Sequence, residues 1–222
     1  MKTDLQIQKD VMDELRWTPL LQSSQIGVAV KDGVVTLSGV VDTYNKKMEA
    51  EQAATSVSGV KAIALEITVG VSPRFKRTDA EIAEAALKAL KDHTSIPDEQ
   101  IKVTVEDGAV TLEGEVEWEY QRAAAKDVIQ NFAGVTNVWN FIKIKPKLAA
   151  IDIKEKIKAA FERSAKLDAS RISVETSGST VTLSGIVASL AEKEDADYAA
   201  WAAPGVTMVF NNLEVAEEEF AF

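Results

Sequence analysis

Four glutamates stand at alternate positions near the middle of the chain, and no other spacing in the sequence is as suggestive of a chemical site. Side chains at alternate positions of an extended strand point to the same face of a sheet. Carboxylate oxygens gathered in this way are ligands that a hard cation such as Ca²⁺ prefers. The pattern is also typical of a solvated strand face, and we favour this interpretation because related segments of the chain lack the acids. The glutamates are Glu113, Glu115, Glu117 and Glu119, and the related segments have Ser38 and Val40, or Ser184 and Ile186, at the first two positions.

Few other residues are candidates for catalysis or metal binding. His93 is the only histidine and the chain has no cysteine, so a zinc site and disulfides are not expected. A nucleophile–base pair would have to use His93, a lysine or a carboxylate, and no local pattern supports one. The G-x-S-x-G elbow, the P-loop and the dinucleotide fingerprint do not occur in the sequence. The sequence therefore predicts no enzyme activity, no metal and no cofactor.

One block of sequence is written three times. DGVVTLSG at 32–39 recurs as DGAVTLEG at 107–114 and, with a different start, as STVTLSG at 179–185. The correspondence extends over whole copies without a gap, and it predicts three tandem folding units at residues 1–72, 78–146 and 149–217. Three copies of one module favour a binding or scaffolding role, because an enzyme usually needs one distinctive site.

Each copy begins with a pattern typical of an amphipathic helix. Thr3 with Gln6, and Thr78 with Glu81, have the spacing of a capping box, in which each side chain bonds the backbone of the other residue. Apolar residues then recur at every fourth position and define one buried stripe. These residues are Ile7, Val11 and Leu15, then Ile82, Ala86 and Leu90, then Ile153, Ile157 and Phe161.

Two strands of alternating apolar residues follow the helix and predict a β-hairpin. Asp32-Gly33 and Asp107-Gly108 are turn pairs, because these residues tolerate the positive φ of a tight reversal. Residues 177–179 take their place in the third copy. A glycine interrupts the inward face of the second strand in every copy, which indicates a close backbone approach, here expected from a helix that crosses the sheet. These glycines are Gly39, Gly114 and Gly185.

A second helix and a third strand complete each copy. The helix is expected over residues 43–58, 118–133 and 189–203, with small apolar residues on its buried face. A glycine stands at the C-cap position of each helix. These glycines are Gly59, Gly134 and Gly205. The order helix–strand–strand–helix–strand predicts an α+β fold of three two-layer units, each a three-stranded mixed sheet with two helices on one face.

This order and its motifs resemble the BON domain, a small module named for bacterial osmotically inducible and nodulation proteins. The DGVVTLSG-type hairpin, the glycine that ends the second helix and the closing segments GVTNVWNFIKI and GVTMVFNNLEV carry the resemblance over nearly the whole chain. Leu65 takes the place of the closing asparagine in the first copy, and the third copy lacks the Asp-Gly turn. The resemblance implies envelope-related, phospholipid-binding or osmotic-stress-related roles and no catalysis.

The charge of the chain narrows the range of partners. The net charge is −10, and such a surface repels nucleic-acid phosphates and anionic lipid headgroups. Arg74, Lys76 and Arg77 form the only basic cluster, which is too short for a groove. Some nucleic-acid-binding modules have a related helix and strand order, but their G-x-x-G loop does not occur here. Nucleic acid is therefore not expected as a partner.

The aromatic residues are the best candidates for an interaction surface, because the repeats supply an internal control. Trp17 aligns with Asp92 and Arg163, and Trp201 aligns with Thr55 and Gln130. A slot that is polar in two copies is expected to face outward, where a tryptophan can anchor an interface. The sheet face away from the helices is also partly apolar, and its aromatic residues are Trp139, Phe141 and Phe210. These side chains are expected to pack against another copy in the same chain, a second chain or a ligand.

The sequence analysis thus favours a non-catalytic binding protein of three BON-like units. Its expected partner is an envelope or phospholipid component or a protein, under osmotic or general stress. The alternative is a structural scaffold that associates with itself as a homo-oligomer. The first residues lack the apolar run of a secretory signal and no long apolar segment follows, which predicts a cytoplasmic protein without a transmembrane segment, or a periplasmic one if a signal has been removed.

Overall fold

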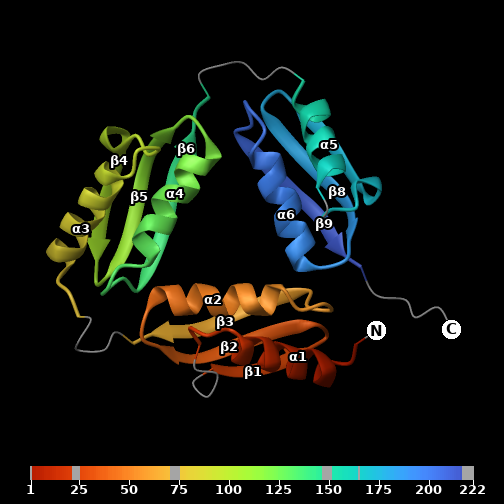
Figure 1. Cartoon of the computed structure of the whole chain (residues 1–222), viewed down its shortest axis with the longest axis horizontal. Helices are drawn as coiled ribbons and strands as arrows, with labels where there is room; N and C mark the ends of the chain where they lie inside the picture. Colours follow the sequence, from red (N-terminus) through yellow and green to blue (C-terminus); the bar gives the residue numbers. More distant parts are fainter. Residues whose placement is uncertain (1, 22–25, 71–75, 147–151, 165, 217–222) are drawn as a thin grey trace. The chain divides into compact units, whose positions relative to one another are not determined.

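The computed structural model describes residues 2–21, 26–70, 76–146, 152–164 and 166–216. Within these ranges the chain folds into three modules with the order helix–strand–strand–helix–strand (Figure 1). The α+β fold of three repeated units is as the sequence predicts. The first module contains α1 (Asp4–Trp17), β1 (Ile26–Lys31), β2 (Val34–Val41), α2 (Tyr44–Thr55) and β3 (Ala62–Val69).

The second and third modules repeat this order, and in both of them a short 3₁₀ turn is described before the hairpin. The second contains α3 (Asp79–Asp92), η2 (Asp98–Gln100), β4 (Ile101–Glu106), β5 (Ala109–Val116), α4 (Glu119–Gln130) and β6 (Asn137–Ile144). The third contains α5 (Ile153–Arg163), η3 (Ala169–Arg171), β7 (Ile172–Ser177), β8 (Thr180–Val187), α6 (Leu190–Trp201) and β9 (Met208–Val215).

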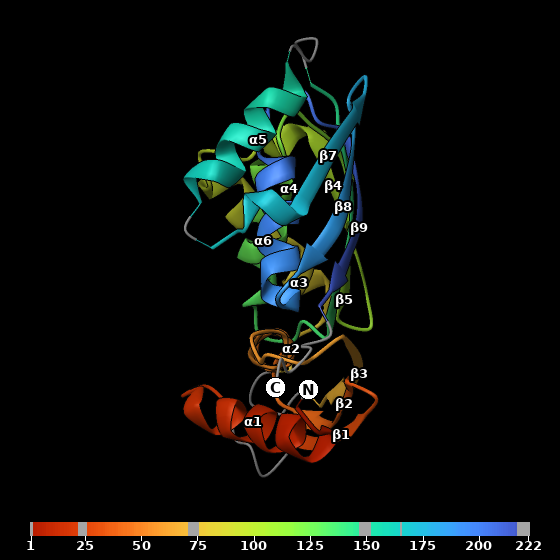
Figure 2. The same cartoon turned by 90° about the vertical axis from the view of Figure 1, so that its right-hand side faces the viewer.

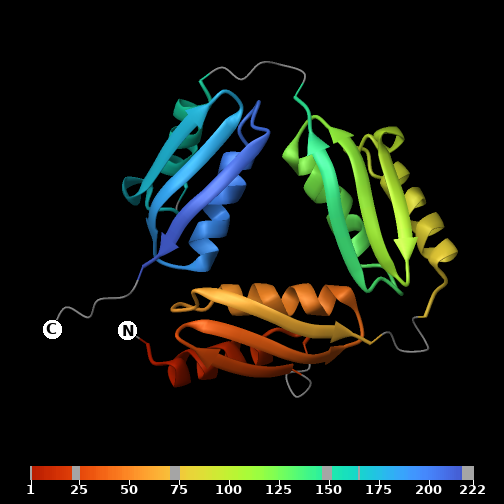
Figure 3. The same cartoon turned by 180° about the vertical axis from the view of Figure 1, so that it is seen from behind.

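Each module has one three-stranded sheet in which the middle strand of the sequence is also central in space. The orders are β1-β2-β3, β4-β5-β6 and β7-β8-β9. In the second module β5 runs antiparallel to β4 and parallel to β6, and β8 does the same with β7 and β9. The helices of each module lie on one face of its sheet (Figures 2 and 3). Each module is therefore two-layered, and one face of its sheet carries no helix of that module.

The apolar stripes of the helices and the inward residues of the strands form a separate core in each module. In the second module the contributors from the helices are Ile82, Ala86, Leu90, Ala125 and Ile129, and those from the strands are Ile101, Val110, Leu112, Val116, Val138 and Ile142. All of them are buried. The small residues on α4 and its counterparts let the helix lie close to the sheet, because a larger side chain there would hold the two layers apart.

The capping boxes are present as the sequence predicts. The Thr3 hydroxyl accepts a hydrogen bond from the Gln6 amide at 3.3 Å, and the Gln6 side chain accepts one from the Thr3 amide at 2.8 Å. Thr78 and Glu81 make the same pair of bonds at the start of α3. These bonds satisfy amides at the helix start that have no partner within the helix.

The hairpin turns also follow from the residue types. Asp32 and Gly33 both have positive φ, as do Asp107 and Gly108, which is the geometry of a type I′ turn. In the third module Gly178 has φ 58° and is the first of two turn residues. A glycine with positive φ at that position is typical of a type II′ turn, which is the second preferred hairpin turn.

The glycines inside β5 and β8 have a different cause from the one expected. A Cβ at Gly114 would lie 2.1 Å from the carbonyl oxygen of Gln100, and one at Gly185 would lie 2.0 Å from that of Arg171. Both oxygens belong to the 3₁₀ turns η2 and η3, which lead into the neighbouring strand. The close approach therefore comes from the turn before β4 or β7 and not from a crossing helix.

The glycines after the second helices allow this helix end to meet the first helix. The C-cap prediction is wrong in position: α2 ends at Thr55, and the C-caps of α4 and α6 are Asn131 and Ala202. Gly59 and Gly134 lie further along, in the turn after the helix, where they have φ 92° and 91°. A Cβ at Gly134 would lie 3.0 Å from Cδ1 of Ile82, and one at Gly59 would lie 3.1 Å from Cδ1 of Ile7. Glycine at this position is required both by the backbone conformation and by the packing.

Candidate interaction surfaces

The four glutamates do not form a site. Glu113 and Glu115 lie on β5, but that strand ends at Val116, and Glu119 begins α4. The ladder is therefore broken after its second member. Three of the carboxylates pair with cations: Glu113 with Lys102 at 3.9 Å, Glu115 with Lys145 at 2.8 Å and Glu119 with Arg122 at 2.7 Å. Within the described ranges no cluster of three or more His, Asp or Glu side chains is arranged to hold a metal ion.

The helix-free face of the second module carries two exposed aromatic side chains on the edge strand β6. Trp139 is 53% exposed and Phe141 is 61% exposed. In the register of the sheet they stand beside Thr111 and Glu113 of β5. Lys102 faces Glu113 from β4, so the aromatic pair is bordered by charged and hydroxyl groups. This arrangement of an apolar centre and a polar rim is typical of a protein interface.

The corresponding face of the third module is apolar in a similar place. Phe210 stands beside Thr182 in the register of β8 and β9, and is 50% exposed. Met208 on the same strand and Ile186 on β8 are exposed to about the same extent. The sequence analysis selected Phe210 but not Met208, although the alternation along β9 places Met208 on the same face.

The first module has a weaker apolar face and a separate exposed tryptophan. On its sheet Val34 and Val40 are exposed. Trp17 at the end of α1 is 83% exposed, which agrees with its outward position in the sequence analysis. Leu20 and Leu5 are also exposed, and neither was selected from the sequence. The three side chains belong to the α1 segment, so they form a surface apart from the sheet.

Trp201 does not lie where the repeat comparison predicts. It is half-buried and packs against the core of its own module. The comparison misled because Thr55, which aligns with Trp201, is itself buried. The Thr55 hydroxyl donates to the carbonyl of Glu51 at 2.9 Å, so a polar residue occupies an inward slot by bonding its own helix. We therefore exclude Trp201 from the candidate surface.

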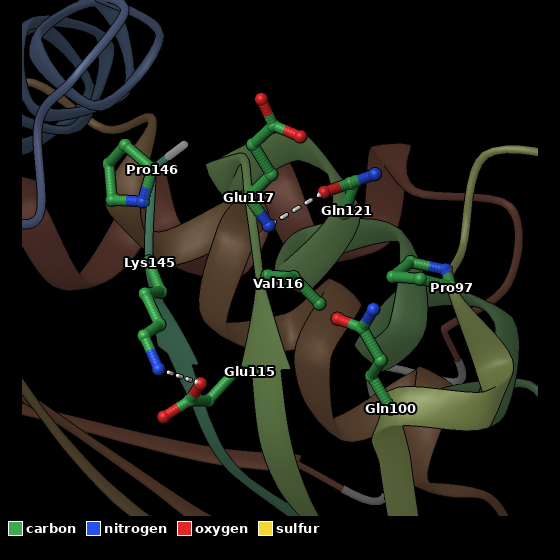
Figure 4. A pocket seen from close by; sticks show the side chains of 8 residues that line it. All are labelled: Pro97, Gln100, Glu115, Val116, Glu117, Gln121, Lys145 and Pro146. Atoms are coloured by element: carbon green, nitrogen blue, oxygen red, sulfur yellow. Dashed lines mark hydrogen bonds and ion pairs between the residues drawn. The ribbon is translucent and has the colours of Figure 1, made fainter. Parts of the chain in front are cut away.

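A cavity of about 320 Å³ opens at the end of β5 and β6 in the second module (Figure 4). Gln121 of α4 closes one side of it. Its Oε1 accepts hydrogen bonds from the amides of Glu117 and Trp118, and its Nε2 donates to the carbonyl of Ser95. The residues that line the cavity are Pro97, Gln100, Glu115, Val116, Glu117, Gln121, Lys145 and Pro146. Because Gln121 already bonds amides at the start of α4, this helix end is a poor site for an anion.

Two of the residues that line the cavity form an ion pair. The ammonium group of Lys145 bonds the carboxylate of Glu115, lowers its pKa and has its own pKa raised in return. Both side chains are more than half exposed, and the pair is a surface ion pair of small energetic value. His93, the only histidine, ends α3, and its backbone amide donates to the carbonyl of Leu90. Neither feature assembles a reactive group.

The described residues also contain no helix with the length and apolar character needed to cross a bilayer. The chain is thus built of small two-layer modules that carry exposed apolar side chains on their surfaces. The BON domain model matches residues 3–71, 78–146 and 152–217. The chain belongs to the BON domain family.

Two proteins have sequences similar to that of the chain. It is 32% identical over 130 residues to Osmotically-inducible protein Y of Escherichia coli strain K12. The aligned region covers 56% of this chain and 64% of that protein. The chain thus spans less than two thirds of the length of this relative. It is 26% identical over 125 residues to an uncharacterized protein from the gshII 5′ region of Anaplasma centrale, covering 55% of this chain and 83% of that one.

The likeness of the chain to solved structures is weaker. The match to CdsD, a structural protein of the type III secretion system of Chlamydia trachomatis, has 16% sequence identity and a TM-score of 0.27. It covers 95% of this chain and 92% of that one. With such a score the similarity carries no argument about the arrangement of the modules or about function.

Proposed function

We propose that this chain is a non-catalytic binding protein whose BON modules recognise their partners through exposed apolar side chains. The exposure of Trp17, Trp139 and Phe141 carries the proposal. Large aromatic side chains stabilise a fold when they are buried, and here they lie outside cores that are already filled. Similarity to Osmotically-inducible protein Y supports a role under osmotic stress.

A phospholipid surface is the partner that fits the first module best. Along α1 the exposed side chains of Leu5, Lys9, Met12 and Arg16 share one side of the helix, and Trp17 and Leu20 follow at its end. Apolar and cationic residues along one side, with a tryptophan at the end, are typical of helices that lie in a membrane interface. The overall charge of −10 opposes binding to anionic headgroups, so we expect zwitterionic surfaces to be preferred.

Vesicle flotation tests this proposal. The wild-type chain is expected to float with phosphatidylcholine vesicles, and the variant Trp17→Ser with Leu20→Ser is expected to stay in the dense fraction. Tyr198→Ser is a matched control, because Tyr198 is an exposed aromatic residue on the second helix of another module. A wild-type chain that binds neither zwitterionic nor anionic vesicles, at low or physiological salt, would contradict the lipid assignment.

A second candidate is a self-associating scaffold in which sheet faces pair. Trp139 and Phe141 with their polar border favour it, because a protein surface can cover an apolar centre and match a charged rim at the same time. Sedimentation equilibrium of the full chain tests this alternative. A chain that stays monomeric up to high concentration would exclude it.

A further inference from the structure

In the second module, the outer edge of β6 is closed by side chains. Asn140 lies at the middle of the strand; its Nδ2 donates to the carbonyl of Arg122 in α4 at 2.8 Å, and its Oδ1 accepts from the Ile142 amide at 3.2 Å. Asn137 accepts from the Val138 amide at 3.0 Å. Because β5 occupies the inner side of β6, these amides face the open edge. Two donors that another strand would need are therefore already bonded.

In the third module, β9 is closed in the same way. Asn211 donates to the carbonyl of Lys193 in α6 at 3.1 Å and accepts from the Leu213 amide at 3.3 Å. The Lys193 ammonium also donates to the Leu213 carbonyl at 2.6 Å. The asparagine of the closing motif thus protects the edge of the sheet, and a nearby lysine adds to this protection.

The first module lacks the side chains that protect the other two edges. Leu65 of β3 corresponds to Asn140 and Asn211, and Ala62 corresponds to Asn137. Neither side chain has a polar atom, so neither can bond the amides of Ile63 and Ile67. The other edge strand of this module does have a side-chain bond, from Gln8 Nε2 to the Val28 carbonyl on β1 at 2.6 Å. The outer edge of β3 is therefore open to strand addition at the positions where β6 and β9 are closed.

We infer that the outer edge of β3 is a pairing surface for β3 of a second copy of this chain, so that two sheets join into one. The inference does not depend on the proposed role of the exposed aromatic residues. The strand AIALEITV is rich in β-forming residues and contains neither proline nor lysine, the two residues that most often discourage edge pairing.

The sequence of β3 fits an antiparallel copy of itself. If Leu65 stands opposite Leu65 of the partner, then Ile63 faces the partner's Ile67. In this register Glu66 faces the partner's Ala64, and the two carboxylates are not opposite each other. The residues whose amides face outward in this module, which correspond to Val138, Asn140 and Ile142, are then all in hydrogen-bonded pairs.

Charge opposes pairing less in the first module than in the second. Residues 1–72 carry seven basic and nine acidic side chains, whereas residues 78–146 carry seven and thirteen. Two first modules therefore repel each other less than two second modules would. Ile63 and Leu65 are only half-buried, so a neighbouring strand would cover apolar area that the module leaves open.

The variant Leu65→Asn tests the inference, because it introduces the residue that closes β6 and β9. We expect the wild-type full chain to dimerise with rising concentration in sedimentation equilibrium, and Leu65→Asn to weaken the dimer at least tenfold. Asn140→Asp is the matched control, since it alters the same position of a module outside the interface and should leave dimerisation unchanged. A monomeric wild-type chain, or a Leu65→Asn chain that dimerises as well as the wild type, would overturn the inference.

A cross-linking experiment tests the register and does not depend on the folding of Leu65→Asn. The chain contains no cysteine, and Ala62 of one copy is expected to face Thr68 of the other, with Cα atoms about 4.5 Å apart. A mixture of Ala62→Cys and Thr68→Cys chains should therefore form a disulfide-linked heterodimer on mild oxidation. Either variant alone should cross-link far more slowly. Equal cross-linking of the single variants and the mixture would overturn the antiparallel register.

Discussion

The carboxylate of Asp79, in the first turn of α3, accepts a hydrogen bond at 2.9 Å from the backbone amide of Gly108 at the tip of the β4–β5 hairpin. Its second oxygen accepts one from the Asp107 amide at 2.9 Å. Asp4 makes the same two bonds to Asp32 and Gly33 in the first module. One side chain therefore joins the start of a helix to a turn that is 28 and 29 residues away in the sequence.

We expect Asp79→Ala to destabilise the second module by about 1–3 kcal/mol, because it removes two charge-assisted bonds to amides in a tight turn. Hydrogen exchange of the β4–β5 peptides in the full chain would measure the change within this module. Asp92→Ala is a suitable control, since Asp92 is an exposed residue at the other end of α3. Equal protection of the hairpin in Asp79→Ala and in the wild type would show that the two hydrogen bonds of Asp79 do not stabilise the second module.

Gly114→Ala should be more damaging than an alanine at a glycine with open space around it. The new Cβ would overlap the Gln100 carbonyl oxygen, and φ at this residue is 144°. We expect a loss of at least about 2 kcal/mol, because backbone atoms have to move. Gly178→Ala is the comparison: it has a positive φ but nothing within 4 Å of its Cβ, and should cost about 1 kcal/mol. The two unfolding transitions can be compared by urea denaturation, and equal losses would contradict this explanation.

The capping box of α3 should make the start of this helix sensitive to acid. Hydrogen bonds from the backbone and side chain of Thr78 lower the pKa of Glu81. A lowered pKa in the folded state means that the stabilisation is complete above the unfolded pKa of a glutamate, about 4.3, and is lost as pH falls through the lower folded value. We expect Glu81→Gln to keep the cap, as Gln6 does in the first module, and to remove this dependence on pH. Amide exchange at the start of α3 that changes equally with pH in both proteins would contradict the prediction.

Trp139→Ser with Phe141→Ser should leave the fold intact while it changes the surface. Both side chains are more than half exposed, so we expect the unfolding free energy of the second module to change by no more than about 1 kcal/mol. Val138→Ser is the contrasting variant, because Val138 is a buried residue of the same strand, and it should cost about 2 kcal/mol or more. Equal destabilisation by the two substitutions would mean that the aromatic pair belongs to the fold.

Most of the fold follows from local chemistry that is legible in the sequence. Helix stripes such as Ile82, Ala86 and Leu90, the capping boxes and the Asp-Gly turns depend on nearest neighbours along the chain, and the structure confirms them. The repeat supported these predictions, because a pattern that occurs three times in register is unlikely to arise by chance. The hydrogen bonds from Asp79 to the hairpin turn, and the close approach of Gln100 to Gly114, join segments that are far apart in the sequence. The spacing of residues along the chain did not reveal them.

The candidate surface was less predictable, because exposure depends on the whole module. Trp17, Trp139, Phe141 and Phe210 are exposed, whereas Trp201 is half-buried against the core of the third module. Thr55, at the equivalent position of the first module, is buried and bonds its own helix, so its polar side chain did not indicate an outward position. The sequence did contain a signal for the role of Asn140 at the outer edge of β6. Leu65 replaces this asparagine in the first module, and that difference could have prompted the question of what the asparagine bonds. Successive amides along a strand point to opposite sides, so the order of the strands in the sheet is enough to show which amides of an edge strand face outward.

The most direct test of binding through exposed apolar side chains is the fluorescence of Trp17 with phosphatidylcholine vesicles. The chain has four tryptophans, and replacement of Trp118, Trp139 and Trp201 by phenylalanine leaves Trp17 as the only one. We expect its emission to shift to shorter wavelength on addition of vesicles and to become protected from an aqueous quencher. Emission and quenching that stay unchanged at saturating lipid would contradict the account.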